Sequence, residues 1–274
     1  MKIVSIGEIT IDRYLRQNLS FVGGISLNFA VNAKRSGADH VSLVSCVGDG
    51  PDGAWVLETL AREEVNGSHV AVLEGKTAEC AVEVYDNADR VFPVGGYRAN
   101  VLSHLHLTDA IKAFISQHDV LVTLYDGSEP ESLTNQLLLL PADKSKRVVD
   151  FGDWSAGIRK EITKETFNNI DLAFVSANEA MVAELLQIGG NVDCLMVVTL
   201  GAAGSVALTA DGVMAQSAVQ VDSPVDSTGC GDAFQAAFTV NYFRDGDIAA
   251  SLYKGAVQAA QVLKHYGAFD QRPI

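Results

Sequence analysis

The most chemically suggestive segment of the chain is a pair of glycines followed directly by an acid. Gly229 and Gly231 flank the small residue Cys230, and Asp232 comes next, near the start of a predicted helix over 231–243. Two glycines let the main chain turn sharply, so that successive N–H groups point outward at the positive end of the helix dipole. The segment therefore predicts an anion site made of main-chain amides, suited to the oxygens of a phosphoryl group in transfer.

Asp232 stands where proton chemistry beside that anion would be useful. A carboxylate at this position can accept the proton of an attacking hydroxyl, which contributes about 10²–10⁴ in rate. The alternative is that Asp232 only caps the helix, as aspartate often does. The adjacent glycines favour the chemical role, and so does an acidic net charge of −14, which leaves few basic residues to hold a phosphate.

Residues 225–234 resemble the C-terminal signature of the ribokinase-like (PfkB) family of carbohydrate and nucleoside kinases, D-T-x-G-A/C-G-D. Further motifs follow in the family's order from Gly7 to Gly267, nearly the whole chain. The resemblance implies transfer of the γ-phosphoryl group of ATP to a hydroxyl of a small sugar. It makes Asp232 the base and the amides of Gly229, Cys230 and Gly231 the anion hole.

The same resemblance assigns residues to the acceptor sugar. Gly23-Gly24 with Asn28 resembles the N-terminal signature, and Asp12 matches a strand-end position where family members hold sugar hydroxyls. A carboxylate and an amide suit adjacent hydroxyls, because together they accept and donate hydrogen bonds. Asp12 in a turn, and Asn28 as a helix cap, are the structural alternatives. We expect Asp12, Gly24 and Asn28 to orient the acceptor.

The nucleotide is expected along a turn that resembles the family's T-x-G-x-x-G motif, here Thr199-Leu200-Gly201-Ala202-Ala203-Gly204. An ordinary β-turn is the alternative. The resemblance implies that Thr199, Gly201 and Gly204 face ATP, together with Asn178.

Two ions are implied by the resemblance. Asp226 and Thr228 match positions that bind potassium in some relatives, with Gly267 nearby. Magnesium accompanies ATP, but the family's N-x-x-E run reads Asn178-Glu179-Ala180-Met181 here, so the fourth position is apolar. Either Glu179 replaces the missing acid through water, or Asp150 or Asp153 helps to hold the metal.

The acceptor itself is suggested by two segments, 85–92 and 265–269, which look similar to the fructoselysine 6-kinase branch of the family. Enzymes of that branch phosphorylate the 6-hydroxyl of a fructosamine. Acidic residues near the predicted lid would suit a cationic amine, whereas Arg90 would bind a phosphate or carboxylate or neither. Fructokinase or ribokinase activity is the alternative, as is a non-catalytic nucleotide- or sugar-binding relative.

The elements that must position these residues follow an alternating rhythm. Short β-branched runs at 2–6, 41–47, 120–125, 147–150, 172–176 and 195–200 alternate with helical patterns at 28–35, 55–63, 110–116 and 179–187. That order predicts a largely parallel sheet with helices on both faces, an α/β three-layer sandwich with ligands at the carboxyl ends of the strands.

Two segments depart from this rhythm and predict strands of a small β-sheet lid, at about 9–21 and 80–100. After residue 200 we expect antiparallel strands at 205–209 and 212–221, joined by a turn at 210–212. A last helix is predicted over 247–266. No internal repeat or linker interrupts the chain, so the sequence predicts one domain over 1–274 that carries the lid. Apolar Val82, Val84 and Phe92 make the lid a candidate dimer surface.

Composition excludes several classes of function. The net charge argues against nucleic acid and against anionic membranes as partners. The four cysteines form no C-x-x-C pair, and no signal peptide or membrane span is apparent, so we expect a cytoplasmic protein. The run Gly48-Asp49-Gly50-Pro51-Asp52-Gly53 satisfies G-x-G-x-x-G, the only support for a nicotinamide-dependent oxidoreductase. Its two acids and its proline favour a tight turn into a helix instead.

Overall fold

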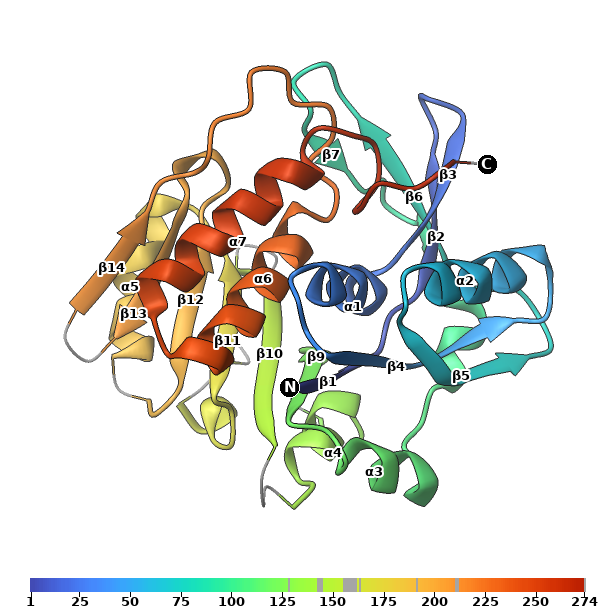
Figure 1. The fold of residues 1–274 in the computed structure, drawn as a ribbon, viewed down its shortest axis with the longest axis horizontal. Coiled ribbons are helices and arrows are strands. Elements are labelled where there is room, and N and C mark those ends of the chain that lie inside the picture. Colours follow the sequence, from blue (N-terminus) through green and yellow to red (C-terminus); the bar gives the residue numbers. More distant parts are fainter. Residues whose placement is uncertain are drawn as a thin grey trace.

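A nine-stranded sheet forms the centre of the molecule, and its middle strands are parallel (Figure 1). The computed structural model describes residues 1–127, 129–141, 145–154, 162, 164–190, 192–209 and 212–273. The strands lie in the order β14-β13-β12-β11-β10-β9-β1-β4-β5, antiparallel only at β12–β13 and β13–β14. Their bounds are β1 Lys2–Ile6, β4 His40–Gly48, β5 Asn66–Leu73, β9 Val120–Leu124, β10 Lys146–Asp153, β11 Leu172–Ser176, β12 Leu195–Thr199, β13 Ser205–Thr209 and β14 Gly212–Gln216.

Helices cover both faces of this sheet, which confirms the predicted three-layer α/β sandwich. The side chains of β1 alternate between the two faces of the sheet, and both faces are apolar. Ile3 packs into the core under α1 and α6, while Val4 and Ile6 face the core under α3 and α4. The helices are α1 Ile25–Arg35, α2 Pro51–Arg62, α3 Asp109–Ile115, α4 Leu133–Leu138, α5 Val182–Gly189, α6 Cys230–Asp245 and α7 Ile248–Val262, with 3₁₀ turns at Asn100–His104, Lys164–Phe167, Glu179–Met181 and Gly201–Ala203.

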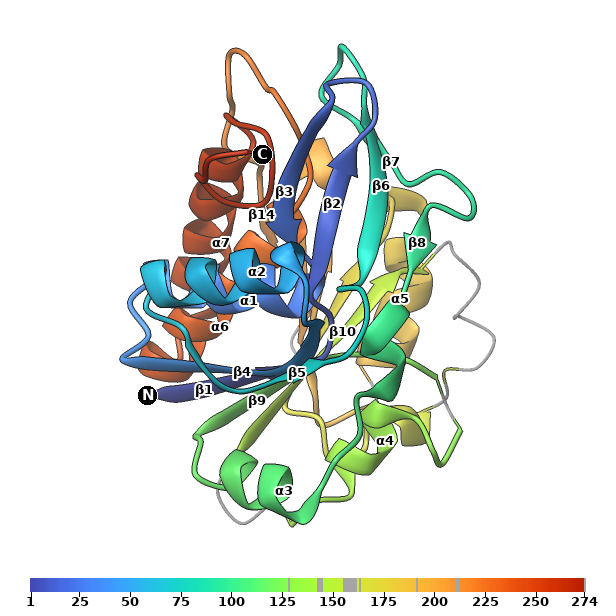
Figure 2. The same cartoon turned by 90° about the vertical axis from the view of Figure 1, so that its right-hand side faces the viewer.

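A second, smaller sheet rises from the carboxyl end of β1 (Figure 2). It contains β2 Thr10–Tyr14, β3 Leu19–Gly23, β6 Glu79–Val84, β7 Arg90–Val91 and β8 Tyr97–Arg98. Val82 and Val84, expected to be exposed, are instead buried against Tyr14 and Phe21, because they face the inner side of this sheet. The edge strand β3 is covered by Gln271, whose Nε2 donates to Val22 O at 2.8 Å and whose Oε1 accepts from Val22 N at 3.2 Å.

Several sequence-based bounds were wrong at their ends. Strand β14 stops at Gln216, short of 221, and α7 stops at Val262, short of 266. The predicted turn at 210–212 lies outside the described residues at 210 and 211. Strand β5 was not predicted, since the first half of this edge strand is polar and only Val70 within it is buried. The run 48–53 does turn into helix α2, with Gly50 as N-cap and Pro51 opening the helix.

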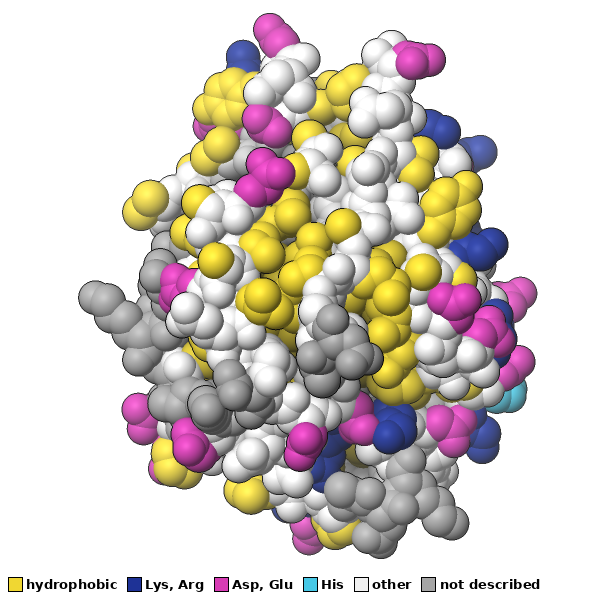
Figure 3. Space-filling model, turned by 90° about the vertical axis from the view of Figure 1, so that its left-hand side faces the viewer, with side chains coloured by type: hydrophobic (Ala, Val, Ile, Leu, Met, Phe, Trp, Pro, Cys, Tyr) yellow, Lys and Arg dark blue, Asp and Glu magenta, His cyan; other side chains and the backbone are white. Residues whose placement is uncertain are grey.

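The far edge of the large sheet, β14, leaves Val213 and Met214 exposed, and apolar side chains gather on that side of the molecule (Figure 3). Within the described residues, no helix combines the length and the apolar character that crossing a membrane requires.

Candidate active site

The start of helix α6 is a main-chain cradle that is packed on one side and open on the other. Gly229, its N-cap, is left-handed, with φ 74°. A Cβ on Gly229 would stand 2.1 Å from Cβ of Ala268, so only glycine fits. A Cβ on Gly231 would meet nothing within 4 Å, so the chain there borders open space. The predicted anion segment therefore has both a rigid back and an accessible front.

Asp232 lies in the first turn of α6 and faces helix α1. Asn28 Nδ2 donates to Asp232 Oδ2 at 2.8 Å, across a separation of 204 residues. Burial raises the pKa of Asp232 to about 7; the Asn28 hydrogen bond lowers it, Asp150 and Glu8 raise it and Arg90 lowers it. A carboxylate with this pKa is well matched to general-base work near neutral pH. The Oδ1 atom of Asn28 is buried and has no hydrogen-bond partner among the described residues.

Asp12 approaches the same place from the small sheet. It is 5% exposed, and its Oδ1 accepts a hydrogen bond from Thr10 Oγ1 at 2.7 Å. Burial raises the pKa of Asp12 to about 7; the Thr10 hydroxyl lowers it, and the charges of Glu8, Asp232 and Asp226 raise it. Two carboxyls predicted from sequence, Asp12 and Asp232, are thus electrostatic neighbours although they come from different elements.

Gly24 links strand β3 of the small sheet to helix α1 and packs closely against the main chain of residues 8–10. Its φ is 99°, and a Cβ there would stand 2.7 Å from both Ile9 Cα and Thr10 N. Gly24 also precedes α1, so the same residue sets the direction in which Asn28 points toward Asp232. The predicted acceptor residues Asp12, Gly24 and Asn28 are therefore brought together.

Glu8 is the site acid that sequence reasoning missed. It lies two residues after the end of β1, its Oε1 accepts from Ile25 N at 3.4 Å, and its main-chain N–H donates to Ser26 Oγ at 3.0 Å. Burial raises the pKa of Glu8, while contacts with the Ile25 N–H and the Tyr97 hydroxyl lower it. Its place at the carboxyl end of a parallel strand is the signal that could have found it.

Asp150, mentioned from sequence only as a possible metal ligand, completes an acidic group. It is 6% exposed on β10, its Oδ1 accepts from Gly152 N at 2.9 Å, and burial raises its pKa. Across the described part of the chain, Glu8, Asp12, Asp150 and Asp232 make no ion pair with lysine or arginine. This concentration of carboxyls without paired cations is the main electrostatic feature of the site.

Arg90 reaches toward the cradle from β7. Its guanidinium stacks over Phe92, 5.3 Å from the ring centroid. Burial raises the pKa of both Cys230 and Asp232, and the charge of Arg90 partly opposes that rise. The turn before it is tied to the cradle, since Ser227 N donates to Ala88 O at 3.0 Å. The one basic residue predicted for the substrate therefore lies on the side where α6 begins.

The predicted nucleotide residues lie farther along the same edge of the sheet, at the ends of β11 and β12. Thr199 Oγ1 lies 3.0 Å from Ser176 Oγ, and Asn178 precedes the 3₁₀ turn Glu179–Met181. Gly204, with φ 102°, passes so close to β14 that a Cβ would stand 2.1 Å from Gln216 O. Gly201 also has positive φ, at 58°, and borders open space. These glycines shape an exposed turn of main chain.

Asp226 and Thr228 form a hydrogen-bonded junction. Oδ1 of Asp226 accepts from Thr228 N at 2.8 Å and Thr228 Oγ1 at 2.7 Å, while Oδ2 accepts from Tyr14 OH at 2.6 Å and Gly267 N at 2.9 Å. All four acceptor positions of the carboxylate are used. The arrangement does not fit a potassium ion held by this carboxylate unless one of the four donors moves.

The structure has separate carboxylates that could contact magnesium, rather than a cluster of side chains that would surround the ion. Among the described residues, no three His, Cys, Asp or Glu side chains are grouped to hold a metal. Asp150 lies beside Asp232, and Glu179 is exposed at the end of β11. This fits an ion that keeps its waters and is carried largely by nucleotide phosphates, as Mg²⁺ commonly is.

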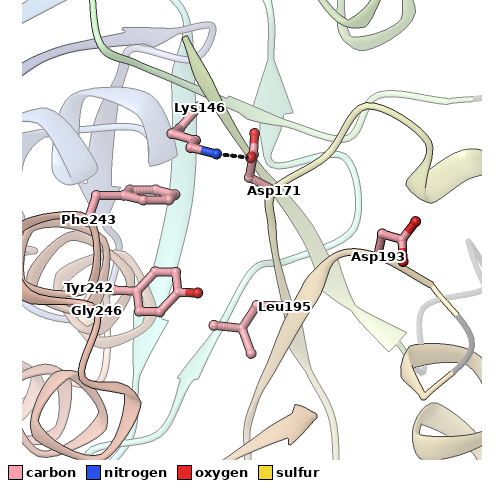
Figure 4. A pocket seen from close by; sticks show the side chains of 7 residues that line it. All are labelled: Lys146, Asp171, Asp193, Leu195, Tyr242, Phe243 and Gly246. Carbon is pink, nitrogen blue, oxygen red and sulfur yellow. Dashed lines mark hydrogen bonds and ion pairs between the residues drawn. The ribbon is translucent and has the colours of Figure 1, made fainter. Parts of the chain in front are cut away.

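A hollow of about 380 Å³ lies elsewhere, at the amino ends of β10 and β12 (Figure 4). It is lined by Lys146, Asp171, Asp193, Leu195, Tyr242, Phe243 and Gly246. Lys146 Nζ donates to Asp171 at 2.7 Å inside it. None of the predicted site residues lines it, and it opens at the end of the sheet opposite the acidic group.

Comparison with known proteins identifies the family of the chain. The model of the pfkB family carbohydrate kinases matches residues 1–274. The chain is 30% identical to the fructoselysine 6-kinase of Escherichia coli (strain K12), over 97% of this chain and 99% of that protein. It is 29% identical to the fructosamine kinase FrlD of Bacillus subtilis (strain 168), over 98% of this chain and 93% of that protein.

Among solved structures, the ribokinase from Cryptococcus neoformans var. grubii serotype A in complex with ADP matches with a TM-score of 0.77 at 18% identity, covering 97% of this chain and 94% of the other. The fold is therefore that of the ribokinases. The chain belongs to the pfkB family of carbohydrate kinases.

Proposed function

We propose that this carbohydrate kinase transfers the γ-phosphoryl group of ATP to the 6-hydroxyl of a fructosamine such as fructoselysine. The observation that carries the proposal is the acidic acceptor end of the site, where Glu8 and Asp12 lie beside Asp232 without a paired cation in the described structure. A neutral sugar leaves that charge uncompensated, whereas a protonated amine neutralises part of it. The names of the relatives at about 30% identity point the same way.

In this mechanism Asp232 accepts the proton of the 6-hydroxyl as the new O–P bond forms and the bond from the γ-phosphorus to the leaving oxygen of ADP breaks. Asn28 holds the Asp232 carboxylate through Nδ2, and its partnerless Oδ1 accepts a hydrogen bond from a sugar hydroxyl. The amides of Gly229, Cys230 and Gly231 stabilise the oxygens of the transferring group at the positive end of α6. Gly24 and Asp12 orient the sugar.

The nucleotide lies along the turn that contains Thr199, Gly201 and Gly204, with Asn178 at its margin. Magnesium neutralises charge on the phosphates when it is bound. Asp150 and, through water, Glu179 are the residues that would hold it, with Met181 in the position where the family has an acid. Arg90 lies near the start of α6, and its positive charge attracts the phosphate groups of ATP.

The small sheet acts in this proposal as a lid over the acceptor within a single functional unit, and as a surface for a second copy of the chain. Phe92 is 51% exposed and Val94 is fully exposed, both in the loop between β7 and β8. The four cysteines are free thiols, in keeping with the proposed cytoplasmic location.

The test is ADP release with Mg-ATP over a panel of fructosamines, hexoses, pentoses and nucleosides. We expect the highest kcat/KM with fructoselysine, and product analysis should find phosphate on its 6-hydroxyl. A preference for free fructose or ribose over every fructosamine would reject this acceptor while leaving the kinase assignment intact.

A further inference from the structure

One row of side chains crosses the small sheet and faces the acceptor. The strand register places Asp12 opposite Cys80, and Cys80 opposite Tyr97, so that the three share one face of the sheet. Burial raises the pKa of both the Cys80 thiol and the Tyr97 phenol, and the Glu8 carboxylate raises both further. Glu8 therefore lies beside this row, in contact with the Tyr97 hydroxyl.

The site carries opposite charge at its two ends, from the start of helix α6 to Glu8. At one end stand Arg90 and the positive end of α6, which suit a phosphoryl group. At the other end stands Glu8, which contacts Ile25, the first residue of α1, whereas Asp232 contacts Asn28 about one turn further along the same helix. Glu8 thus lies about one helical turn away from the base, and its charge also acts on Asp12.

We propose that Glu8 is the residue that binds the ammonium group of the acceptor, and so selects amine-bearing sugars over neutral ones. The inference rests on the proposed function and deepens it. A sugar with its 6-hydroxyl at Asp232 turns its opposite end toward Glu8, where a secondary ammonium meets a half-buried carboxylate. Tyr97 is a positioning residue that limits where this carboxylate can lie.

The alternative role for Glu8 is purely structural. Its Oε1 accepts the Ile25 N–H at the first turn of α1, where a negative charge also favours the helix dipole. Glutamine keeps that acceptor and removes the charge, so Glu8→Gln separates the two roles. Glu83→Gln is the matched control, because Glu83 lies on β6 of the same sheet at the odd-numbered positions that face away from Cys80, Val82 and Val84.

The experiment compares 1-amino-1-deoxyfructose with fructose as acceptors for the wild-type enzyme and both variants. For Glu8→Gln we expect the ratio of kcat/KM for amine over neutral sugar to fall about 10- to 100-fold, through KM for the amine. For the same variant, kcat/KM for fructose should fall by less than kcat/KM for the amine. Glu83→Gln should keep the wild-type ratio. Tyr97→Phe should lower the ratio by less than Glu8→Gln does, through KM for the amine.

A substrate-side measurement needs no variant and guards against misfolding. The uncharged amide 1-acetamido-1-deoxyfructose should lose the advantage of the amine with the wild-type enzyme. A wild-type enzyme that prefers fructosamines, with Glu8→Gln keeping that preference on a folded protein, would overturn the role of Glu8 alone. A wild-type enzyme that phosphorylates no fructosamine would overturn the proposed acceptor and this inference together.

Discussion

The two ends of the proposed active site are built from different parts of the polypeptide. The phosphoryl end is main chain: the amides that open α6, shaped by Gly229 against Ala268. The acceptor end is side chain: Asp12, Glu8 and Tyr97, carried there by strand register and by the join between two sheets. Main-chain geometry tolerates little change, whereas side chains can be exchanged. Within such a framework the transfer chemistry can stay constant while the sugar it acts on varies.

The largest effect is expected from Asp232→Asn, which removes the base but keeps an oxygen that can accept the hydrogen bond from Asn28. We expect kcat to fall about 10²–10⁴-fold with little change in KM for the sugar. Steady-state kinetics checks this, and circular dichroism controls for folding. Unchanged kcat would mean that the acid at α6 does not take the proton.

Gly229→Ala tests the phosphoryl end through its main chain. The added Cβ would collide with Ala268, so the amides must move, and we expect about a 10²–10³-fold loss of kcat with a loss of stability of about 2–4 kcal/mol. Gly246→Ala is the control, since Gly246 ends the same helix with φ 73° and an unobstructed Cβ direction. It should cost about 1 kcal/mol in unfolding and leave kcat unchanged. If the two variants lowered kcat equally, the main-chain amides at the start of α6 would not have the proposed role in phosphoryl transfer.

The dependence of kcat/KM on pH tests the two buried carboxyls together, Asp12 at the acceptor end and Asp232 at the phosphoryl end. Because the pKa values of Asp12 and Asp232 are both raised to about 7, the active form with ionised carboxyls is lost as pH falls through 7. We expect kcat/KM to drop about tenfold per pH unit just below pH 7, to approach about a 100-fold drop per unit at lower pH where both carboxyls are protonated, and to level off above about pH 8. A profile flat from pH 5 to 8 would be inconsistent with buried, raised carboxyls.

The smallest effect is on stability, from Asp12→Asn. The folded-state pKa of about 7 lies above the ordinary 3.8, so the stabilisation that Asp12 gives is present at low pH and is lost as pH rises through 7. At pH 8 the variant avoids a buried charge and should be more stable than wild type by about 1–3 kcal/mol. Near pH 4 the gain should vanish. Urea unfolding at both pH values checks this, and an equal gain at both would point to packing instead.

The comparison also explains what could be foreseen from sequence. The parallel sheet and its two helical layers follow from apolar runs such as Leu172–Ser176, which are buried on both faces. The main-chain anion site could be predicted because its glycines, Gly229 and Gly231, form a recognisable local motif in the sequence. Tyr97 was not, since its place depends on the pairing of β8 with β6, which no local pattern encodes. The predicted last residues of β14 and α7 were wrong because tertiary contacts, rather than local propensity, determine where these two elements end.

Gln271 and Asp226 have a consequence for how the chain matures during synthesis. Gln271 lines the edge of β3 across 249 residues, and Asp226 binds Tyr14 across 212. A ribosome therefore releases the first strands of the small sheet long before their last contacts exist. The small sheet therefore gains these contacts only after residues 226–271 have been synthesised and the long loops have closed.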